Sequence, residues 1–302
     1  MLKEGLLAQI EKLLQDEGYA YCTYKGCFDL AAKKEKLLFL KVLQNIDSFS
    51  EEQARNLLTL AHSIGATIFL IGKNTTRERL GQGIVYERFG VPAVSFETFK
   101  LFVSEGMFPS IYRQRGGLFV HIDREALKET RNAKGMTQME LAELVGVSKK
   151  AIYEHEARNL KMLLSIAQRL EEMLEKKLIS KQEPEITDRG FHSEPADELE
   201  KKVGCELKKL GFQINFVKQA PADIFARKEA LLISDVEEKE RKMKGRSEKL
   251  KEFIEVAEKP AVIITEKANE KDYEIPVVRR RELAEMSSKS LFRIAKKSRR
   301  YK

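Results

Sequence analysis

Tryptophan is absent from the 302-residue sequence, and cysteine and histidine are scarce, with three and four residues. Cys22, Cys27 and Cys205 form an odd and widely spaced set, which argues against a disulfide framework and favours a reducing compartment. Cys22 and Cys27 have no second ligand pair at a spacing that binds zinc, and the histidines do not cluster in the sequence. The sequence therefore predicts a protein without a metal site or a cofactor.

Long apolar runs are also missing. No stretch approaches the roughly 20 apolar residues that a transmembrane helix needs, and residues 3–5 (KEG) interrupt the region where a signal peptide would have its apolar core. Hydrophobic residues nevertheless make up 42% of the chain, which is enough to build real cores. A chain of this length predicts two or three domains. We therefore expect a multidomain cytoplasmic protein with no membrane partner.

The net charge of +8 is concentrated at one end of the chain. Residues 279–302 contain ten lysine and arginine residues and two acidic residues, so this segment alone accounts for the net charge. We predict a basic tail that adds non-specific affinity for phosphate, while a merely solvated or disordered terminus is the alternative reading. The residues singled out in this tail are Arg293, Lys296, Lys297, Arg299 and Arg300.

The most informative stretch is residues 127–160, where two short helical patterns are separated by Gly146. Thr137 can cap the first helix, and Ser148 can cap the second. The apolar positions of the first helix are Met139, Leu141, Ala142 and Val145, and those of the second include Ala151 and Ile152. Two short helices joined by a turn of about three residues form a helix-turn-helix.

The order Thr-Gln-x-x-Leu-Ala-x-x-x-Gly-Val-Ser-x-x-x-Ile resembles the DNA-binding domain of Cro and the phage repressors (XRE type) over roughly Ile122–Leu178. The resemblance implies a first helix at about Arg124–Ala133, later helices within Leu160–Lys177, and a recognition helix after the turn that enters the major groove. Such domains bind as dimers, so we expect a homodimer whose contacts come from Leu160–Leu178 and the flanking domains. Asn159 stands where the family usually has glycine, and we expect it to adopt the left-handed conformation.

The resemblance also implies a set of DNA contacts. Lys149 and Lys150 would open the recognition helix and donate to guanine O6 and N7. On the same face, Glu154 would accept from cytosine N4 and Tyr153 would touch a thymine methyl group. Gln138 matches a glutamine that contacts backbone phosphate.

Three further residues complete the predicted site. Ser148, the cap of the recognition helix, is assigned to the DNA-binding set. Arg131 and Glu156 match a pair that joins the first helix to the end of the recognition helix. A surface ion pair that contributes little is the alternative for these two residues.

The segments on either side of the helix-turn-helix repeat one another. Residues 29–42 (DLAAKKEKLLFLKV) and 223–236 (DIFARKEALLISDV) align with a shift of 194, and seven of fourteen positions are identical. A helix precedes each stretch, and a helix and an apolar strand follow it. We therefore predict an all-α helix-turn-helix domain between two related α/β domains with mixed sheets. The predicted boundaries are 1–116, 117–181 and 196–302, with a linker at 182–195 and another polar connection at 106–117.

The order of elements in each copy resembles the restriction-endonuclease-like, or PD-(D/E)xK, superfamily. Such nucleases hold Mg²⁺ with an aspartate on one strand and an acid-x-Lys on the next. Asp29 and Asp223 match the aspartate, but the next strands read Phe39-Leu40-Lys41 and Ile233-Ser234-Asp235 and lack the second acid. One carboxylate holds Mg²⁺ poorly. We therefore expect inactive copies without metal, used for dimerisation or ligand sensing, in which both aspartates cap a turn or a sheet edge.

The whole arrangement resembles an archaeal family of helix-turn-helix regulators of about this length. The leading hypothesis is a sequence-specific transcriptional regulator that binds double-stranded DNA, is not an enzyme and has an unknown effector. One alternative is a metal-dependent nuclease that the helix-turn-helix targets to DNA. The other is a coactivator whose repressor-like domain binds a protein, because residues 123–158 carry seven basic and seven acidic residues.

Overall fold

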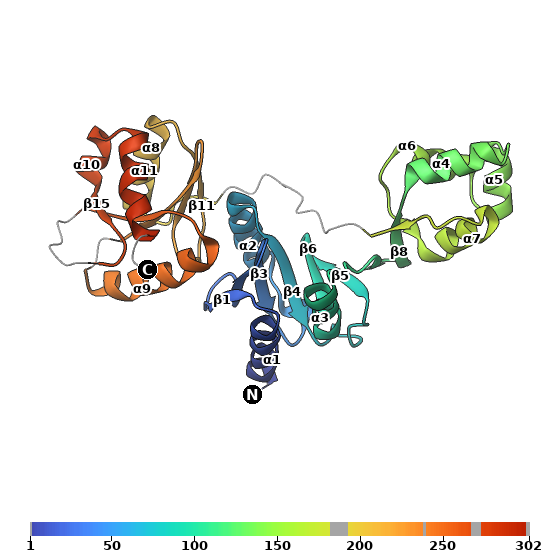
Figure 1. The fold of residues 1–302 in the computed structure, drawn as a ribbon, viewed down its shortest axis with the longest axis horizontal. Coiled ribbons are helices and arrows are strands. Elements are labelled where there is room, and N and C mark those ends of the chain that lie inside the picture. Colours follow the sequence, from blue (N-terminus) through green and yellow to red (C-terminus); the bar gives the residue numbers. More distant parts are fainter. Residues whose placement is uncertain (1, 182–192, 238–239, 267–272, 300–302) are drawn as a thin grey trace. The chain divides into compact units, whose positions relative to one another are not determined.

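The computed structural model describes residues 2–181, 193–237, 240–266 and 273–299 (Figure 1). The chain forms two compact units. The first unit comprises the described residues of Met1–Leu70, Phe89–Val91 and Ile186–Lys302, and the second comprises Ile71–Arg88 and those of Pro92–Glu185. Most of the predicted linker, residues 182–192, lies outside the described residues. No helix within the described ranges is long and apolar enough to cross a membrane.

The first unit opens with the N-terminal copy of the repeat. Its elements are α1 (Leu2–Asp16), β1 (Ala20–Thr23), β2 (Leu30–Lys33), β3 (Leu37–Val42), the 3-10 turn η1 (Ile46–Ser48), α2 (Glu51–Ile64) and β4 (Thr67–Gly72). β1, β2 and β3 form an antiparallel meander. α2 begins at Ser50, whose side chain forms a capping box with Gln53, and ends at Gly65 in the left-handed conformation.

The C-terminal copy lies in the same unit. Its elements are α8 (Glu198–Lys209), β11 (Gln213–Phe216), β12 (Ile224–Arg227), β13 (Leu231–Val236), α9 (Glu240–Ala257), β14 (Ala261–Thr265), β15 (Val277–Arg279), α10 (Arg280–Glu285), α11 (Ser288–Ala295) and the 3-10 turn η2 (Lys296–Arg299). The sheet has the order β11-β12-β13-β14-β15. Its first three strands are antiparallel, whereas β13, β14 and β15 are parallel.

The two copies have the same strand register, which confirms the predicted repeat of α/β domains. Leu30 of β2 pairs with Leu40 of β3, and Ile224 of β12 pairs with Ser234 of β13. Both pairs are related by the same shift of 194 positions.

The copies contact one another reciprocally through equivalent helices. Phe253 on α9 packs against Phe28 and Phe39 of the first copy, with ring centroids 5.9 and 6.1 Å apart. In return, Ser63 on α2 accepts hydrogen bonds from the side chains of Asn215 (2.9 Å, at Oγ) and Arg227 (2.8 Å, at the carbonyl oxygen). The repeat therefore forms an internal pair within one chain.

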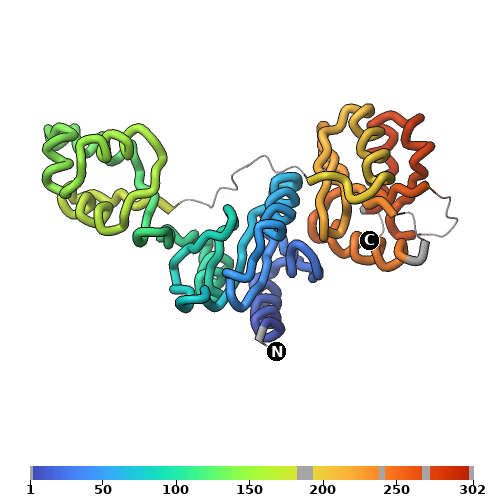
Figure 2. Tube along the Cα trace, turned by 180° about the vertical axis from the view of Figure 1, so that it is seen from behind, coloured from blue at the N-terminus to red at the C-terminus, as the bar shows by residue number. Residues whose placement is uncertain are grey.

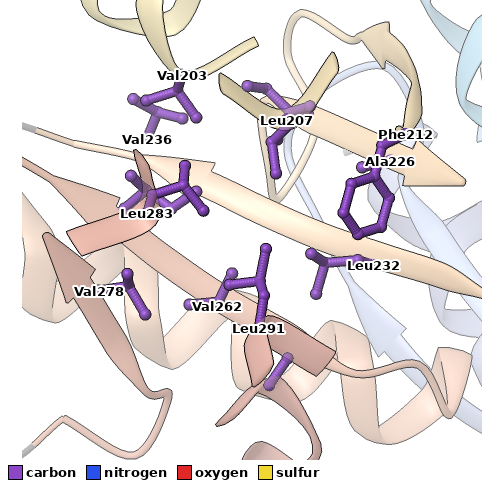
Figure 3. Close-up of a cluster of buried hydrophobic side chains, with 13 residues drawn as sticks. Val203, Leu207, Phe212, Ala226, Leu232, Val236, Val262, Val278, Leu283 and Leu291 are labelled. Atoms are coloured by element: carbon purple, nitrogen blue, oxygen red, sulfur yellow. The ribbon is translucent and has the colours of Figure 1, made fainter. Parts of the chain in front are cut away.

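The core of the C-terminal copy explains the fold of the segment predicted as a basic tail. Three helices, α8, α10 and α11, contribute to a single apolar cluster over the sheet (Figure 3). Leu283 of α10 and Leu291 and Ala295 of α11 are fully buried in that cluster. The reading of this segment as a disordered terminus is therefore wrong for residues 280–285 and 288–299, which are helical.

The second unit contains the remaining elements. They are β5 (Ile84–Arg88), β6 (Val91–Ser95, from Pro92 onward), α3 (Phe96–Glu105), β7 (Ile111–Gln114), β8 (Gly117–Ile122), α4 (Arg124–Ala133), α5 (Gln138–Val145), α6 (Lys149–Ala157), β9 (Met162–Leu163), α7 (Leu164–Leu174) and β10 (Ile179–Ser180). β5 pairs in parallel with β7, which forms an antiparallel hairpin with β8. The predicted polar connection at 106–117 was therefore wrong where it contains β7.

The helices α4–α7 close around one apolar core, to which β8 also contributes (Figure 2). Leu127, Leu141, Val145 and Ile152 are completely buried there, together with Val120 of β8. Packing against this core therefore fixes α5 and α6, and with them the turn that joins them. Met139, which was expected in this core, is 50% exposed, because it lies on the outer side of α5.

Candidate nucleic-acid interface

Local capping chemistry sets the boundaries of α5. The Thr137 side chain accepts from the Glu140 backbone N–H at 3.2 Å, and the Glu140 carboxylate accepts from the Thr137 N–H at 2.7 Å. This backbone donor lowers the pKa of Glu140. At the other end Gly146 has φ 72°, and Arg169 of α7 donates to the Val145 carbonyl oxygen at 3.0 Å. The turn is thus held both by its own glycine and by a side chain from another helix.

α6 begins at Ser148, whose hydroxyl accepts from the Ala151 N–H at 3.1 Å. Ile152 is buried against the core, whereas Lys149, Lys150 and Tyr153 are exposed, Tyr153 by 55%. The first turn of α6 contains two lysines and no acidic residue. Because the N-terminal end of a helix carries partial positive charge, this placement is unfavourable for the helix alone and favourable for an anion.

The predicted pair of Arg131 and Glu156 is brought together by the fold. Arg131 donates to the Glu156 carboxylate from Nε at 2.6 Å and from Nη2 at 3.1 Å, and both side chains are at least 90% buried. Gln138 donates from Nε2 to the same carboxylate at 2.8 Å. Three helices, α4, α5 and α6, therefore meet at one buried carboxylate, in a geometry far from that of an exposed surface pair.

Some predicted contact residues also have partners inside the domain. The Glu154 carboxylate forms an ion pair with Arg158 one helical turn later, with Oε2 and Nε 3.2 Å apart. Gln138 is held by Glu156, an interaction that nothing in the local sequence indicated. The expected left-handed Asn159 was wrong, since α6 ends at an extended Arg158 and Asn159 has no positive φ. Its side-chain oxygen lies 3.2 Å from His121 Nδ1.

The first α/β copy shows why its nuclease-like position is degenerate. Asp29 is buried, and its carboxylate accepts from the Val42 N–H at 2.7 Å and from Lys3 Nζ at 2.9 Å. Lys41 Nζ lies 3.5 Å from the same carboxylate. The position of the missing acid is Phe39, which is fully buried and stacked on Phe28. The carboxylate is therefore neutralised by lysines, and β3 supplies no second acid for a shared metal.

The second copy has the same backbone contact and a different cation. Asp223 accepts from the Val236 N–H at 3.0 Å, which is the equivalent of the bond from Asp29 to Val42. At the position of Lys41 stands Asp235, which is fully buried. Arg246 of α9 bridges the two carboxylates, from Nη2 to Asp223 at 2.6 Å and from Nε to Asp235 at 3.0 Å. Burial raises the pKa of Asp235, and the guanidinium opposes that rise.

A divalent metal, which active nucleases of this fold require, does not fit either copy. Within the described ranges no group of three or more histidine, cysteine or acidic side chains could hold a metal ion. In the first copy a phenylalanine fills the place of the second acid, and in the second copy a guanidinium occupies the space between the carboxylates. No catalytic step through a metal follows from these residues.

The predicted basic residues at the C-terminal end lie on folded elements. Arg293 is on α11, and Lys296 and Lys297 are on η2, where all three side chains are exposed. Arg299 ends η2, and Arg300 lies outside the described residues. These residues and the exposed face of α6 belong to different compact units.

Comparison with known proteins bears on both the first α/β copy and the chain as a whole. Residues 3–109 match a family model described as a PD-(D/E)XK superfamily domain. A protein of Pyrococcus furiosus is 35% identical over 290 residues, which cover 92% of either chain. Relatives in Methanocaldococcus jannaschii and Methanothermobacter thermautotrophicus are 34% and 33% identical and cover 95% and 96% of this chain and 94% of their own. All three carry the name "putative HTH-type transcriptional regulatory protein".

The chain belongs to this archaeal family of HTH-type transcriptional regulatory proteins. No solved structure matches it. For this HTH-type regulatory protein, the family match at residues 3–109 confirms the nuclease-like fold that the order of elements predicted for the first copy. The helical segment α4–α7 lies between the two mixed α/β sheets in the sequence, as expected.

Proposed function

We propose that the protein is a sequence-specific regulator of the Cro/phage-repressor type that reads double-stranded DNA with α6 in the major groove. One observation carries this proposal. The buried network at Glu156 and the caps at Thr137 and Ser148 fix α6 on its inner side, while Lys149, Lys150 and Tyr153 point away from the core without a partner among the described residues. A helix held in this way presents side chains to a groove with little loss of conformational entropy on binding.

The exposed side chains have chemistry that suits base edges and phosphate. Lys149 and Lys150 can donate to guanine O6 and N7, and the Tyr153 ring can touch a thymine methyl group. Ser148 can donate its hydroxyl hydrogen to a phosphate while its oxygen caps the helix. Glu154 can accept from cytosine N4 when Arg158, which is 69% exposed, turns toward the backbone phosphates.

A second copy of the chain would supply the second half-site. One recognition helix makes few base contacts, so useful specificity requires a pair. The α/β copies already contact one another within the chain, and the segment after α6 exposes Leu160 (42%), Leu163 (39%) and Met173 (39%). We propose that these residues contribute the homodimer contact, which a molar mass measurement by light scattering would test.

The α/β copies have no catalytic role in this proposal. A nuclease that the helix-turn-helix directs to DNA is the rival supported by the fold of residues 3–109. Its active site would require the second acid that Phe39 and Ile233 replace. We propose that the copies act as a structural pair that carries the DNA-binding segment.

Selection of bound fragments from a random duplex pool tests the function. The purified full-length protein should enrich a two-fold symmetric sequence with half-sites about one helical turn apart. The variant Lys149→Ala/Lys150→Ala should lose that enrichment and keep its fold, because both side chains are exposed. A pool that stays unenriched with the wild-type protein, or an unchanged motif with the variant, would count against α6 as the reading element.

A further inference from the structure

We propose that the outer face of α11 and η2 is a second DNA-binding surface, which takes the phosphate backbone of duplex DNA without base preference. This basic face consists of Lys289, Arg293, Lys296 and Lys297. The inference rests on the proposed function and deepens it, because it adds a contact from the first compact unit to the DNA that α6 reads. The proposal requires α11 and η2 to be a rigid part of the fold, and the four charges to be exposed and not paired with acidic side chains.

Packing fixes the orientation of the basic face. Leu291 points into the core of the C-terminal copy (Figure 3), and Ala295 is fully buried in the same apolar cluster. Ser298 anchors the following turn, since its hydroxyl accepts from the Ala261 N–H at 3.2 Å and donates to the Ala295 carbonyl oxygen at 2.6 Å. The inward residues recur at a spacing of three or four, so Arg293, Lys296 and Lys297 share the opposite, exposed side.

The four cations of the basic face are exposed and have no counter-ion. In the part of the chain that the structure describes, no acidic side chain pairs with any of them, and residues 288–299 contain no acid. Nearby arginines differ in this respect, because Arg280 donates to Glu266 at 2.5 Å and Arg279 lies 3.7 Å from Glu282. Four uncompensated charges on one folded face repel one another, a cost that a polyanion would relieve.

The first copy provides an internal comparison. In each copy, a helix follows the strand that carries the matched segments Val91-Pro92-Ala93-Val94 and Ile275-Pro276-Val277-Val278. After the first segment that helix is α3, which has one lysine and two glutamates, and after the second it is α10, which has two arginines and two glutamates. α11 and η2 come after this matched helix, so their concentration of positive charge is not required by the shared arrangement.

Duplex DNA fits this surface better than an anionic membrane does. An amphipathic helix that binds a membrane must insert its apolar side into the lipid. The apolar residues of α11 are committed to the protein core, so only point charges remain for a ligand. Lysine and arginine on a rigid face can neutralise successive phosphates and release their counterions, and Arg293 can bind one phosphate with two hydrogen bonds.

The salt dependence of binding to a random-sequence duplex tests this proposal. The full-length variant Lys289→Ala/Arg293→Ala/Lys296→Ala/Lys297→Ala should reduce the slope of log K against log salt by about 3.6, or roughly 0.9 for each lost contact. A matched control removes four exposed lysines from α8, a helix that also carries three glutamates: Lys201, Lys202, Lys208 and Lys209. The control should change the slope by less than about one.

Several outcomes would overturn the proposal that the basic face binds DNA. An equal change in both variants would indicate a general charge effect, and an unchanged slope in the first variant would exclude the contact. Loss of binding to phosphatidylserine vesicles with unchanged binding to DNA would assign the face to membranes. Circular dichroism should show the same helix content in all proteins.

The same binding experiment separates this proposal from the function of α6. On a selected duplex, the basic-face variant should keep its preference over a random duplex, whereas Lys149→Ala/Lys150→Ala should lose the preference and keep the slope contributed by α11 and η2. If the basic-face variant kept both the preference for the selected duplex and the wild-type slope, DNA binding by the basic face would be contradicted and recognition by α6 would stand. If the wild-type protein showed no such preference while the basic-face variant still lost slope, recognition by α6 would be contradicted and DNA binding by the basic face would stand.

Discussion

The exposed face of α6 and the nuclease-like positions of the α/β copies differ in what their charged groups contact. On α6, Lys149 and Lys150 are exposed and have no partner among the described residues. In the copies, Asp29 is neutralised by Lys3, and Asp223 and Asp235 share Arg246. Charges that are already satisfied within the fold stabilise it, whereas charges kept in solvent remain available to a ligand. The comparison therefore supports the proposal that α6 recognises DNA and that both copies have a structural role.

The largest expected effect tests whether the α6 face depends on the buried network beneath it. Glu156→Ala leaves the buried Arg131 guanidinium without its carboxylate, so the free energy of unfolding of the second unit should fall by about 3–5 kcal/mol. Urea unfolding followed by circular dichroism measures this loss. The exposed variant Lys149→Ala/Lys150→Ala is the control and should stay within about 0.5 kcal/mol of wild type. Equal losses in both variants would contradict the distinction between the inner and outer sides of α6.

A smaller loss is expected in the C-terminal copy. Arg246→Ala removes the cation that Asp223 and Asp235 share, and the cost should be about 2–3 kcal/mol, because the guanidinium side chain is 34% exposed and partly screened. The double variant Arg246→Ala/Asp235→Asn should regain part of this loss, since the buried carboxylate is then neutral. A single variant as stable as wild type would show that the guanidinium is not needed.

The smallest effect concerns pH. Burial raises the pKa of Asp235 above its ordinary value of 3.8 and the Arg246 guanidinium opposes that rise, so the folded state loses this proton at a somewhat higher pH than the unfolded state does. Stability should therefore fall as pH rises above about 4, by no more than about 1.4 kcal/mol in total, which corresponds to roughly one pKa unit. Asp235→Asn should remove this part of the pH dependence in urea titrations. An unchanged pH profile would mean that Arg246 keeps the carboxylate ionised throughout.

Local sequence signals predicted the helix-turn-helix closely. Thr137, Gly146 and Ser148 act on their nearest neighbours, so both bounds of α5 and the start of α6 follow from capping chemistry alone. The repeat was equally accessible, because the shift of 194 positions preserves both the strands and the contact of Asp29 with Val42.

Interactions between distant residues could not be predicted in the same way. The hydrogen bond from Gln138 to Glu156 depends on how α5 crosses α6, and Arg246 reaches Asp235 only after α9 packs on the sheet. The helices α10 and α11 were missed, because the ten lysines and arginines of residues 279–302 obscure the helical spacing of the apolar residues that anchor them. β7 was read as a polar connection, since its partners β5 and β8 determine its structure.

The most direct test of the whole account follows one selected duplex, with Mg²⁺ present, for both binding and integrity. The account predicts tight binding without cleavage, unaffected by Asp29→Ala or Asp223→Ala, and a loss of about 1–3 kcal/mol for each base contact removed at Lys149 or Lys150. Cleavage that Asp29→Ala or Asp223→Ala abolishes, together with binding that does not depend on the two lysines, would contradict it.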